Sequence, residues 1–134
     1  MNIQELLIET LQCHKRVGLT GPPWSGKTAA VAGMPWHSHN VYHTDDFIDG
    51  SFRQSWSGLL KATAGQDVLV EGCAIPRAVE YGLLLNVVIV INVPLADLPL
   101  RHRGFWRANE TIIQRIQEAG QHIIMIEGQT YHAD

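Results

Sequence analysis

The segment at positions 21–28 combines the residue types that bind phosphate groups in proteins. Its spacing matches G-x-x-x-x-G-K-[ST], with Gly21 and Gly26 at the glycine positions, followed by Lys27 and Thr28. Glycines let such a loop turn its backbone N–H groups toward phosphate oxygens, the lysine adds a positive charge, and the hydroxyl can ligate Mg²⁺. The residues that we assign to a nucleotide site in this loop are Gly21, Pro22, Pro23, Trp24, Ser25, Gly26, Lys27, Thr28 and Ala29.

The residues around this loop supply the structural context that it needs. A short strand is predicted at 16–20 and a helix at 26–33, so the loop joins a strand to a helix. The competing interpretation, a chance glycine-rich turn followed by a surface lysine, leaves that context unexplained. Trp24 stands where the pattern accepts any residue, and we expect its indole to point out of the loop.

Three carboxylates follow the next two predicted strands. Asp45 and Asp46 come after a strand at 40–44, and Glu71 ends an apolar strand at 67–71. Ligands of parallel α/β sheets bind beyond the carboxyl ends of the strands, so these side chains are predicted to face the phosphate loop. An Asx-turn or a helix cap is the competing interpretation for both aspartates. Glu71 has fewer structural explanations, because an unpaired buried carboxylate is costly.

The alternation of strands and helices predicts the fold class. Further strands are expected at 86–93 and 122–126, and helical segments separate the strands. The expected helices are 2–14, 26–33, 52–64, 78–85, 94–103 and 110–119, with Asn109 as the cap of the last one. This order predicts an α/β fold, a three-layer α/β/α sandwich around a five-stranded parallel sheet, formed by residues 1–134 as a single domain.

Composition narrows the function classes. Ten Lys and Arg against 13 Asp and Glu give a net charge of −3, which argues against general binding to nucleic acid or acidic membranes. The longest apolar run is far shorter than the about 20 residues that span a bilayer. Cys13 and Cys73 lack metal-ligand spacing, and His37, His39 and His43 share no consistent face, so no zinc site is predicted. With no signal-peptide pattern, we expect a cytoplasmic protein.

Three segments resemble a known family. Residues 18–28, 44–47 and 68–72 are similar to the phosphate loop, the Asp-x-Phe motif and the hydrophobic-Glu-Gly motif of P-loop small-molecule kinases, the group of uridine kinase, nicotinamide riboside kinase and pantothenate kinase. The resemblance implies a P-loop NTPase fold of the nucleoside/nucleotide kinase type, with ATP and Mg²⁺ as cofactors. It implies that Asp45 accepts the proton of the acceptor hydroxyl and helps to position Mg²⁺. Glu71 would hold the metal through water or touch the acceptor.

The resemblance also gives a role to the arginines after the fourth strand. In these kinases a short helical lid brings arginines to the β- and γ-phosphates, and the matching segment here is 95–109. Arg101 and Arg103 are then expected to act with Lys27 in catalysis, and Arg107 to contact the nucleotide. A solvated helix face with acidic partners is the competing interpretation. Because this lid is brief, another subunit of a homodimer could be needed to complete closure.

The acceptor side carries weaker signals. Asp46, Arg53 and Arg77 flank the expected acceptor pocket, and Trp56 could stack on a planar ring; surface arginines and core aromatics are the competing interpretation. Together these residues predict a phosphotransferase that moves the γ-phosphate of ATP to a hydroxyl or phosphate of a small molecule, with a nucleoside or nucleotide favoured. The alternative is a nucleotide-binding regulatory or interaction module with little or no transferase activity, which Trp24 and the short lid favour.

Overall fold

A five-stranded, all-parallel sheet organises the protein. The computed structural model describes residues 2–23, 25–33, 39–47 and 55–128. The strands lie in the order β2-β3-β1-β4-β5. Their bounds are β1 Arg16–Thr20, β2 Asn40–His43, β3 Val68–Glu71, β4 Val87–Asn92 and β5 Ile123–Glu127. The predicted α/β class and the predicted five-stranded parallel sheet are therefore confirmed.

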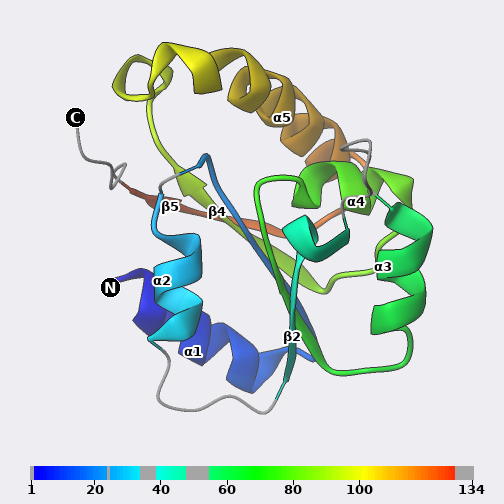
Figure 1. The fold of residues 1–134 in the computed structure, drawn as a ribbon. Helices are drawn as coiled ribbons and strands as arrows, with labels where there is room; N and C mark the ends of the chain where they lie inside the picture. Colours follow the sequence, from blue (N-terminus) through cyan, green and yellow to red (C-terminus); the bar gives the residue numbers. More distant parts are fainter. Residues whose placement is uncertain (1, 24, 34–38, 48–54, 129–134) are drawn as a thin grey trace.

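Helices cover the sheet on both sides (Figure 1), which is compatible with a three-layer sandwich. On one side lie α1 and α2, and on the other lie α3, α4 and α5. Two short 3₁₀ helices follow β2 and β4. The bounds are α1 Ile3–Cys13, α2 Lys27–Ala32, η1 Thr44–Phe47, α3 Trp56–Thr63, α4 Ile75–Tyr81, η2 Leu95–Asp97 and α5 Leu100–Glu118.

The three central strands form the core because apolar side chains project from both of their faces. Every residue of β3 is buried, as are the last four residues of β1 and the first five of β4. This near-continuous burial is typical of parallel strands covered on both faces. Leu7 and Leu11 of α1 pack into this core, as do Trp106 and Ile113 of α5.

The strand order places a topological switch point between β1 and β3. β1 lies between β3 and β4. The chain leaves β1 toward α2 on one side of the sheet and leaves β3 toward α4 on the other (Figure 1). At such a switch point, the carboxyl ends of two adjacent strands border the usual ligand crevice of open α/β sheets. The phosphate-loop motif follows β1 and Glu71 ends β3, so both lie at this switch point.

Three helix predictions were wrong in their bounds. The helices expected at 94–103 and 110–119 are a single helix, α5, after the short η2. Asn109 is therefore no cap; it is fully buried inside α5, where its Nδ2 donates to the carbonyl oxygen of Cys73 at 3.2 Å. The helix expected at 78–85 begins three residues earlier, with Pro76 in its first turn, and ends at Tyr81. None of the described helices is both long enough and apolar enough to cross a membrane.

Candidate functional site

The phosphate-loop motif lies between β1 and α2, as predicted. Gly21, Pro22 and Ser25 are buried, and the Ser25 N–H donates to the carbonyl oxygen of Pro22 at 3.3 Å. Gly26 precedes α2 with a φ of +90°, a left-handed conformation that glycine adopts without steric cost. Trp24 lies outside the described residues. The second glycine of the motif is thus required by the backbone turn that starts the helix.

Lys27 is a buried cation held by neutral groups. Only 6% of the residue is exposed, and its Nζ donates to the Pro22 carbonyl oxygen at 2.8 Å and to Ser25 Oγ at 3.4 Å. Within the described part of the chain, Lys27 forms no ion pair. A buried charge without a counter-charge is unfavourable, so this position favours the arrival of an anion.

The carboxylate of Glu71 connects its own strand, β3, with α2 and β2. Its Oε1 accepts from Thr28 Oγ1 of α2 at 3.4 Å and from His43 Nδ1 of β2 at 2.5 Å. The residue is only 5% exposed. An ionised carboxylate only accepts hydrogen bonds, so His43 is the donor of this contact in the tautomer or charged form that has its proton on Nδ1. The predicted metal residues Thr28 and Glu71 are therefore in contact, and their oxygens are of the kind that Mg²⁺ prefers.

Asp45 and Asp46 lie at the same edge of the sheet. Both are exposed residues of η1, directly after β2, while Glu71 ends the neighbouring strand β3. The negative charges of Asp45 and Glu71 both act on the thiol of Cys73. In the part of the chain that the structure describes, no group of three or more His, Cys, Asp or Glu side chains could hold a metal ion.

Cys73 belongs to this cluster, and sequence reasoning missed it. Burial raises the pKa of the Cys73 thiol, while the positive charge of Lys27 and a hydrogen bond from it oppose that rise. The signal that could have found this residue is its position, two residues after the carboxylate that ends β3. Its thiol thus lies beside the lysine of the phosphate loop.

The loop after β3 is held closely against β1 and η1. The Gly72 N–H donates to the Leu19 carbonyl oxygen at 3.0 Å, and Thr20 Oγ1 donates to the Gly72 carbonyl oxygen at 2.8 Å. Gly72 has a φ of +151°, and a Cβ at this position would overlap the hydroxyl of Thr44. No side chain other than hydrogen fits here, so the Glu-Gly pair reflects close packing beside the site.

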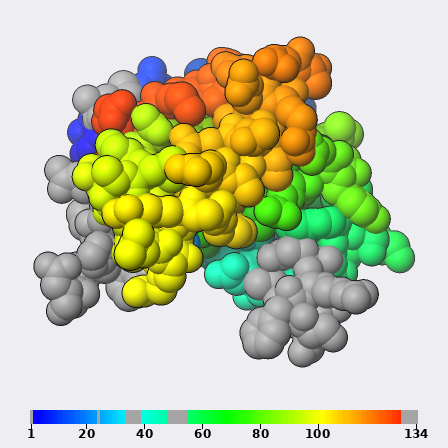
Figure 2. Space-filling model, turned by 90° about the horizontal axis from the view of Figure 1, so that it is seen from above, coloured from blue at the N-terminus to red at the C-terminus, as the bar shows by residue number. Residues whose placement is uncertain are grey.

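The expected lid, 95–109, comprises η2 and the first half of α5. Figure 2 shows this segment, coloured yellow to orange, along one face of the molecule. Arg103 donates to the main chain of η2 and the following turn, to the Leu98 carbonyl oxygen at 2.9 Å and the Ala96 carbonyl oxygen at 3.1 Å. Arg101 and Arg107 are exposed on α5. Trp106 and Asn109 are buried and anchor this half of the helix.

The structure describes two of the three residues that were predicted to bind the acceptor, Asp46 and Arg77. Asp46 and Arg77 are exposed, and the Arg77 guanidinium lies 5.8 Å from the centre of the Phe105 ring. Arg53 lies outside the described residues. Trp56 and Arg77 line one surface groove together with Tyr81, so the structure brings together two residues from the expected acceptor side.

The competing interpretation of the arginines after β4, a helix face with acidic partners, describes Arg115. Its Nε and one terminal nitrogen each donate to a carboxylate oxygen of Glu80 at 2.8 Å. The hydrogen bond from Arg115 lowers the pKa of Glu80. This arginine forms an exposed pair with Glu80 of α4, and both residues also line the groove that contains Trp56 and Arg77.

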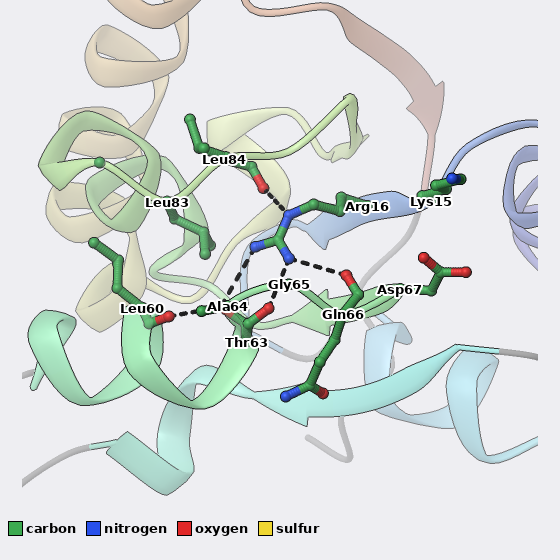
Figure 3. Close-up of a pocket in the computed structure, with 11 residues that line it drawn as sticks. Lys15, Arg16, Leu60, Thr63, Ala64, Gly65, Gln66, Asp67, Leu83 and Leu84 are labelled. Atoms are coloured by element: carbon green, nitrogen blue, oxygen red, sulfur yellow. Dashed lines mark hydrogen bonds between the residues drawn. The ribbon is translucent and has the colours of Figure 1, made fainter.

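A cavity of about 540 Å³ lies at the opposite, amino-terminal edge of the sheet (Figure 3). Arg16 lines it, but its guanidinium is already engaged with main-chain carbonyl oxygens. Nε donates to Leu84 at 2.6 Å, and one terminal nitrogen donates to Thr63 at 2.7 Å and to Gln66 at 3.0 Å (Figure 3). The arginine therefore connects two loops, and this cavity is a weaker candidate than the cluster around Lys27 and Glu71.

No protein-family model matches this sequence, and comparison with curated proteins finds no significant relative.

Proposed function

We propose that the protein has the P-loop NTPase fold and is an ATP- and Mg²⁺-dependent phosphotransferase acting on a small molecule. One observation carries the proposal: Lys27, a buried cation without a described counter-charge, lies in a motif loop next to Thr28, which contacts the buried carboxylate of Glu71. A buried cation beside a hydroxyl and a carboxylate suits a nucleotide phosphate chain with its divalent ion.

The phosphates of ATP would replace the neutral partners of Lys27. In the protein alone, Nζ binds oxygens of its own loop, at Pro22 and Ser25. Phosphate oxygens carry more negative charge, so exchanging partners strengthens the interaction of the ammonium group. The residues of the loop from Gly21 to Thr28, with Ala29, would surround the phosphates.

Thr28 and Glu71 would hold Mg²⁺, with Asp45 close by. Hydroxyl and carboxylate oxygens are ligands that Mg²⁺ accepts, and this ion usually keeps several waters and substrate oxygens besides one or two protein ligands. When bound, Mg²⁺ neutralises charge on the β- and γ-phosphates. Glu71 is already held by His43, so its carboxylate does not need to be ordered when the metal arrives.

Asp45 would accept the proton of the acceptor. The acceptor hydroxyl forms a new bond to the γ-phosphorus, the bond from that phosphorus to the bridging β-phosphate oxygen breaks, and ADP leaves. The hydroxyl proton passes to the exposed carboxylate of Asp45. Arg101 and Arg103 would stabilise the transferring group and Arg107 the nucleotide, which requires Arg103 to leave the carbonyl oxygens of Leu98 and Ala96.

A nucleoside or nucleotide is the favoured acceptor class. Arg77 and Arg53 offer positive charge for an acceptor phosphate, Asp46 offers a hydrogen-bond acceptor for a hydroxyl or amino group, and Trp56 offers a ring for stacking. The groove that Trp56 shares with Arg77 supports this assignment.

An Asp45→Asn variant tests the transfer step. We expect transfer from γ-labelled ATP to the best acceptor among a panel of nucleosides and nucleotides to fall about 100-fold or more, because general-base catalysis contributes about 10²–10⁴-fold. ATP affinity should persist. Asp67→Asn, an exposed aspartate at the opposite edge, is the matched control. Equal transfer by Asp45→Asn and wild type would contradict the assigned base.

The second candidate is a nucleotide-binding module with little or no transfer. The engagement of Arg103 with its own main chain and the burial of Trp106 and Asn109 favour it, since they hold the lid segment in place. Tight ATP binding without transfer to any acceptor in the panel would select this candidate.

A further inference from the structure

His43 is a polar residue at the metal-binding end of the sheet that the proposed mechanism does not yet use. It occupies the last position of β2 and lies in register with Glu71 of β3. Residues in register on adjacent strands have side chains on the same face, and here they meet, with Nδ1 of His43 2.5 Å from Oε1 of Glu71. The histidine side chain is 38% exposed and the glutamate side chain 7%.

We propose that His43 is a positioning residue for the Mg²⁺ site, and that it acts by fixing the carboxylate of Glu71. The inference rests on the proposed function. Metal sites commonly depend on outer partners that orient the direct ligands, and loss of such a partner typically weakens metal binding about 10–100-fold.

The hydrogen bonds of Glu71 are unevenly divided between its two oxygens. Oε1 accepts from both Thr28 and His43. Within the described residues, no side chain or main-chain group donates to Oε2. A carboxylate can accept about four hydrogen bonds, two at each oxygen. Occupation of Oε1 thus leaves Oε2 for the metal or one of its waters.

His43 is the closer of the two partners that hold this carboxylate. The contact from Thr28 is 3.4 Å long, near the limit of a useful hydrogen bond, whereas the contact from His43 is much shorter. A buried carboxylate that lost its main partner would be destabilised and free to rotate. The order of Glu71 therefore depends chiefly on the imidazole.

The same arrangement also orients Thr28. Its hydroxyl proton points to Oε1 of Glu71, so the lone pairs of Oγ1 stay available for a cation. His43 acts on Glu71, and Glu71 in turn acts on Thr28, so one imidazole orders both predicted protein ligands. Loss of His43 should reduce the contribution of Mg²⁺ to nucleotide binding more than binding of the nucleotide itself.

Calorimetric titration of ATP into the full chain, once with excess Mg²⁺ and once with EDTA, tests this inference. We expect Mg²⁺ to tighten ATP binding to the wild type, and His43→Leu to reduce that gain about 10–100-fold while leaving the affinity in EDTA unchanged. His43→Asn, which can place an amide N–H near the position of Nδ1, should restore most of the gain. His122→Leu, which removes an exposed histidine at the opposite edge, is the matched control.

The outcomes separate this inference from the proposed function. If the wild type and His43→Leu show the same Mg²⁺-dependent gain, His43 has no positioning role and the proposed function stands. If the wild type binds no ATP in either condition, both fail. An equal loss of affinity with Mg²⁺ and with EDTA would indicate a general structural role and overturn the inference. His43→Gln, whose amide lies one carbon further out, replaces His43→Leu if the latter does not fold.

Discussion

Two buried charges of opposite sign define the site at the scale of single residues. Lys27 and Glu71 are 6% and 5% exposed, and each is held by groups other than the opposite charge. Among the described residues they do not pair with each other. A direct pair would satisfy both charges and leave little attraction for a ligand. Because the two charges are separate, Lys27 is available to a phosphate group and Glu71 is available to a metal ion.

The thiol of Cys73 provides a test of the surroundings of Lys27. Because burial raises the pKa of Cys73, little of it is thiolate at neutral pH, and alkylation by iodoacetamide should be slower than at the exposed Cys13. The alkylation rate at Cys73 should keep rising as the pH increases toward the raised pKa. Peptide mass spectrometry over time gives both rates, with Cys13→Ser and Cys73→Ser as controls. Equal rates at neutral pH would contradict the described burial.

Sequence reasoning found the residues whose signal is local and missed those whose role depends on strand pairing. The loop that includes Gly26 and Lys27 was predicted because its spacing is continuous along the chain. His43 was interpreted as a loop or strand histidine, since its contact with Glu71 arises only when β2 pairs with β3. Cys73 escaped notice for a similar reason: Lys27 and Asp45, which act on it, lie far away in sequence.

Among the helices and strands, the order of the sheet determines which loops meet, and α5 packs against α4 on one side of the sheet. The bounds of all five described strands were predicted to within one residue at each end. Helix bounds were harder, because the side chain of Asn109 is typical of a cap yet forms a tertiary hydrogen bond in the middle of α5. Local sequence carries no information on a partner such as the carbonyl of Cys73.

Arg16 connects two loops at the amino-terminal edge, and its removal should lower stability without affecting the site. Arg16→Met loses charged hydrogen bonds to the carbonyl oxygens of Leu84, Thr63 and Gln66, so we expect the free energy of unfolding to fall by about 2 kcal/mol. Arg16→Lys should keep only part of the unfolding free energy that Arg16→Met loses, because an ammonium group cannot form the same set of hydrogen bonds as the forked guanidinium. Urea denaturation measures the unfolding free energy of both variants.

The neighbouring Lys15 supplies the control for this prediction. It is exposed, so Lys15→Met should leave the unfolding free energy nearly unchanged. ATP affinity should be the same in all three variants, since the cavity beside Arg16 lies away from the phosphate loop. A loss of ATP affinity in Arg16→Met without a loss of stability would show that this cavity takes part in nucleotide binding.

At the scale of the whole molecule, 134 residues form a sheet of five strands with helices on both sides. The alternating order of elements was sufficient to predict this architecture, because parallel strands need crossover helices and their burial leaves continuous apolar runs. Most of the chain therefore builds the scaffold. The segment between β4 and β5 supplies η2 and α5, half of which is anchored through Trp106, so the space for a moving lid is small.

Calorimetric titration of ATP with Mg²⁺ measures whether a nucleotide binds where Lys27 lies buried. Lys27→Ala should weaken ATP binding about 10–100-fold, as expected for the loss of charged hydrogen bonds worth about 1.5–3 kcal/mol. Lys61→Ala, which removes an exposed lysine of α3, should bind like the wild type. If the wild type binds no ATP, or if Lys27→Ala binds it equally well, the account is contradicted.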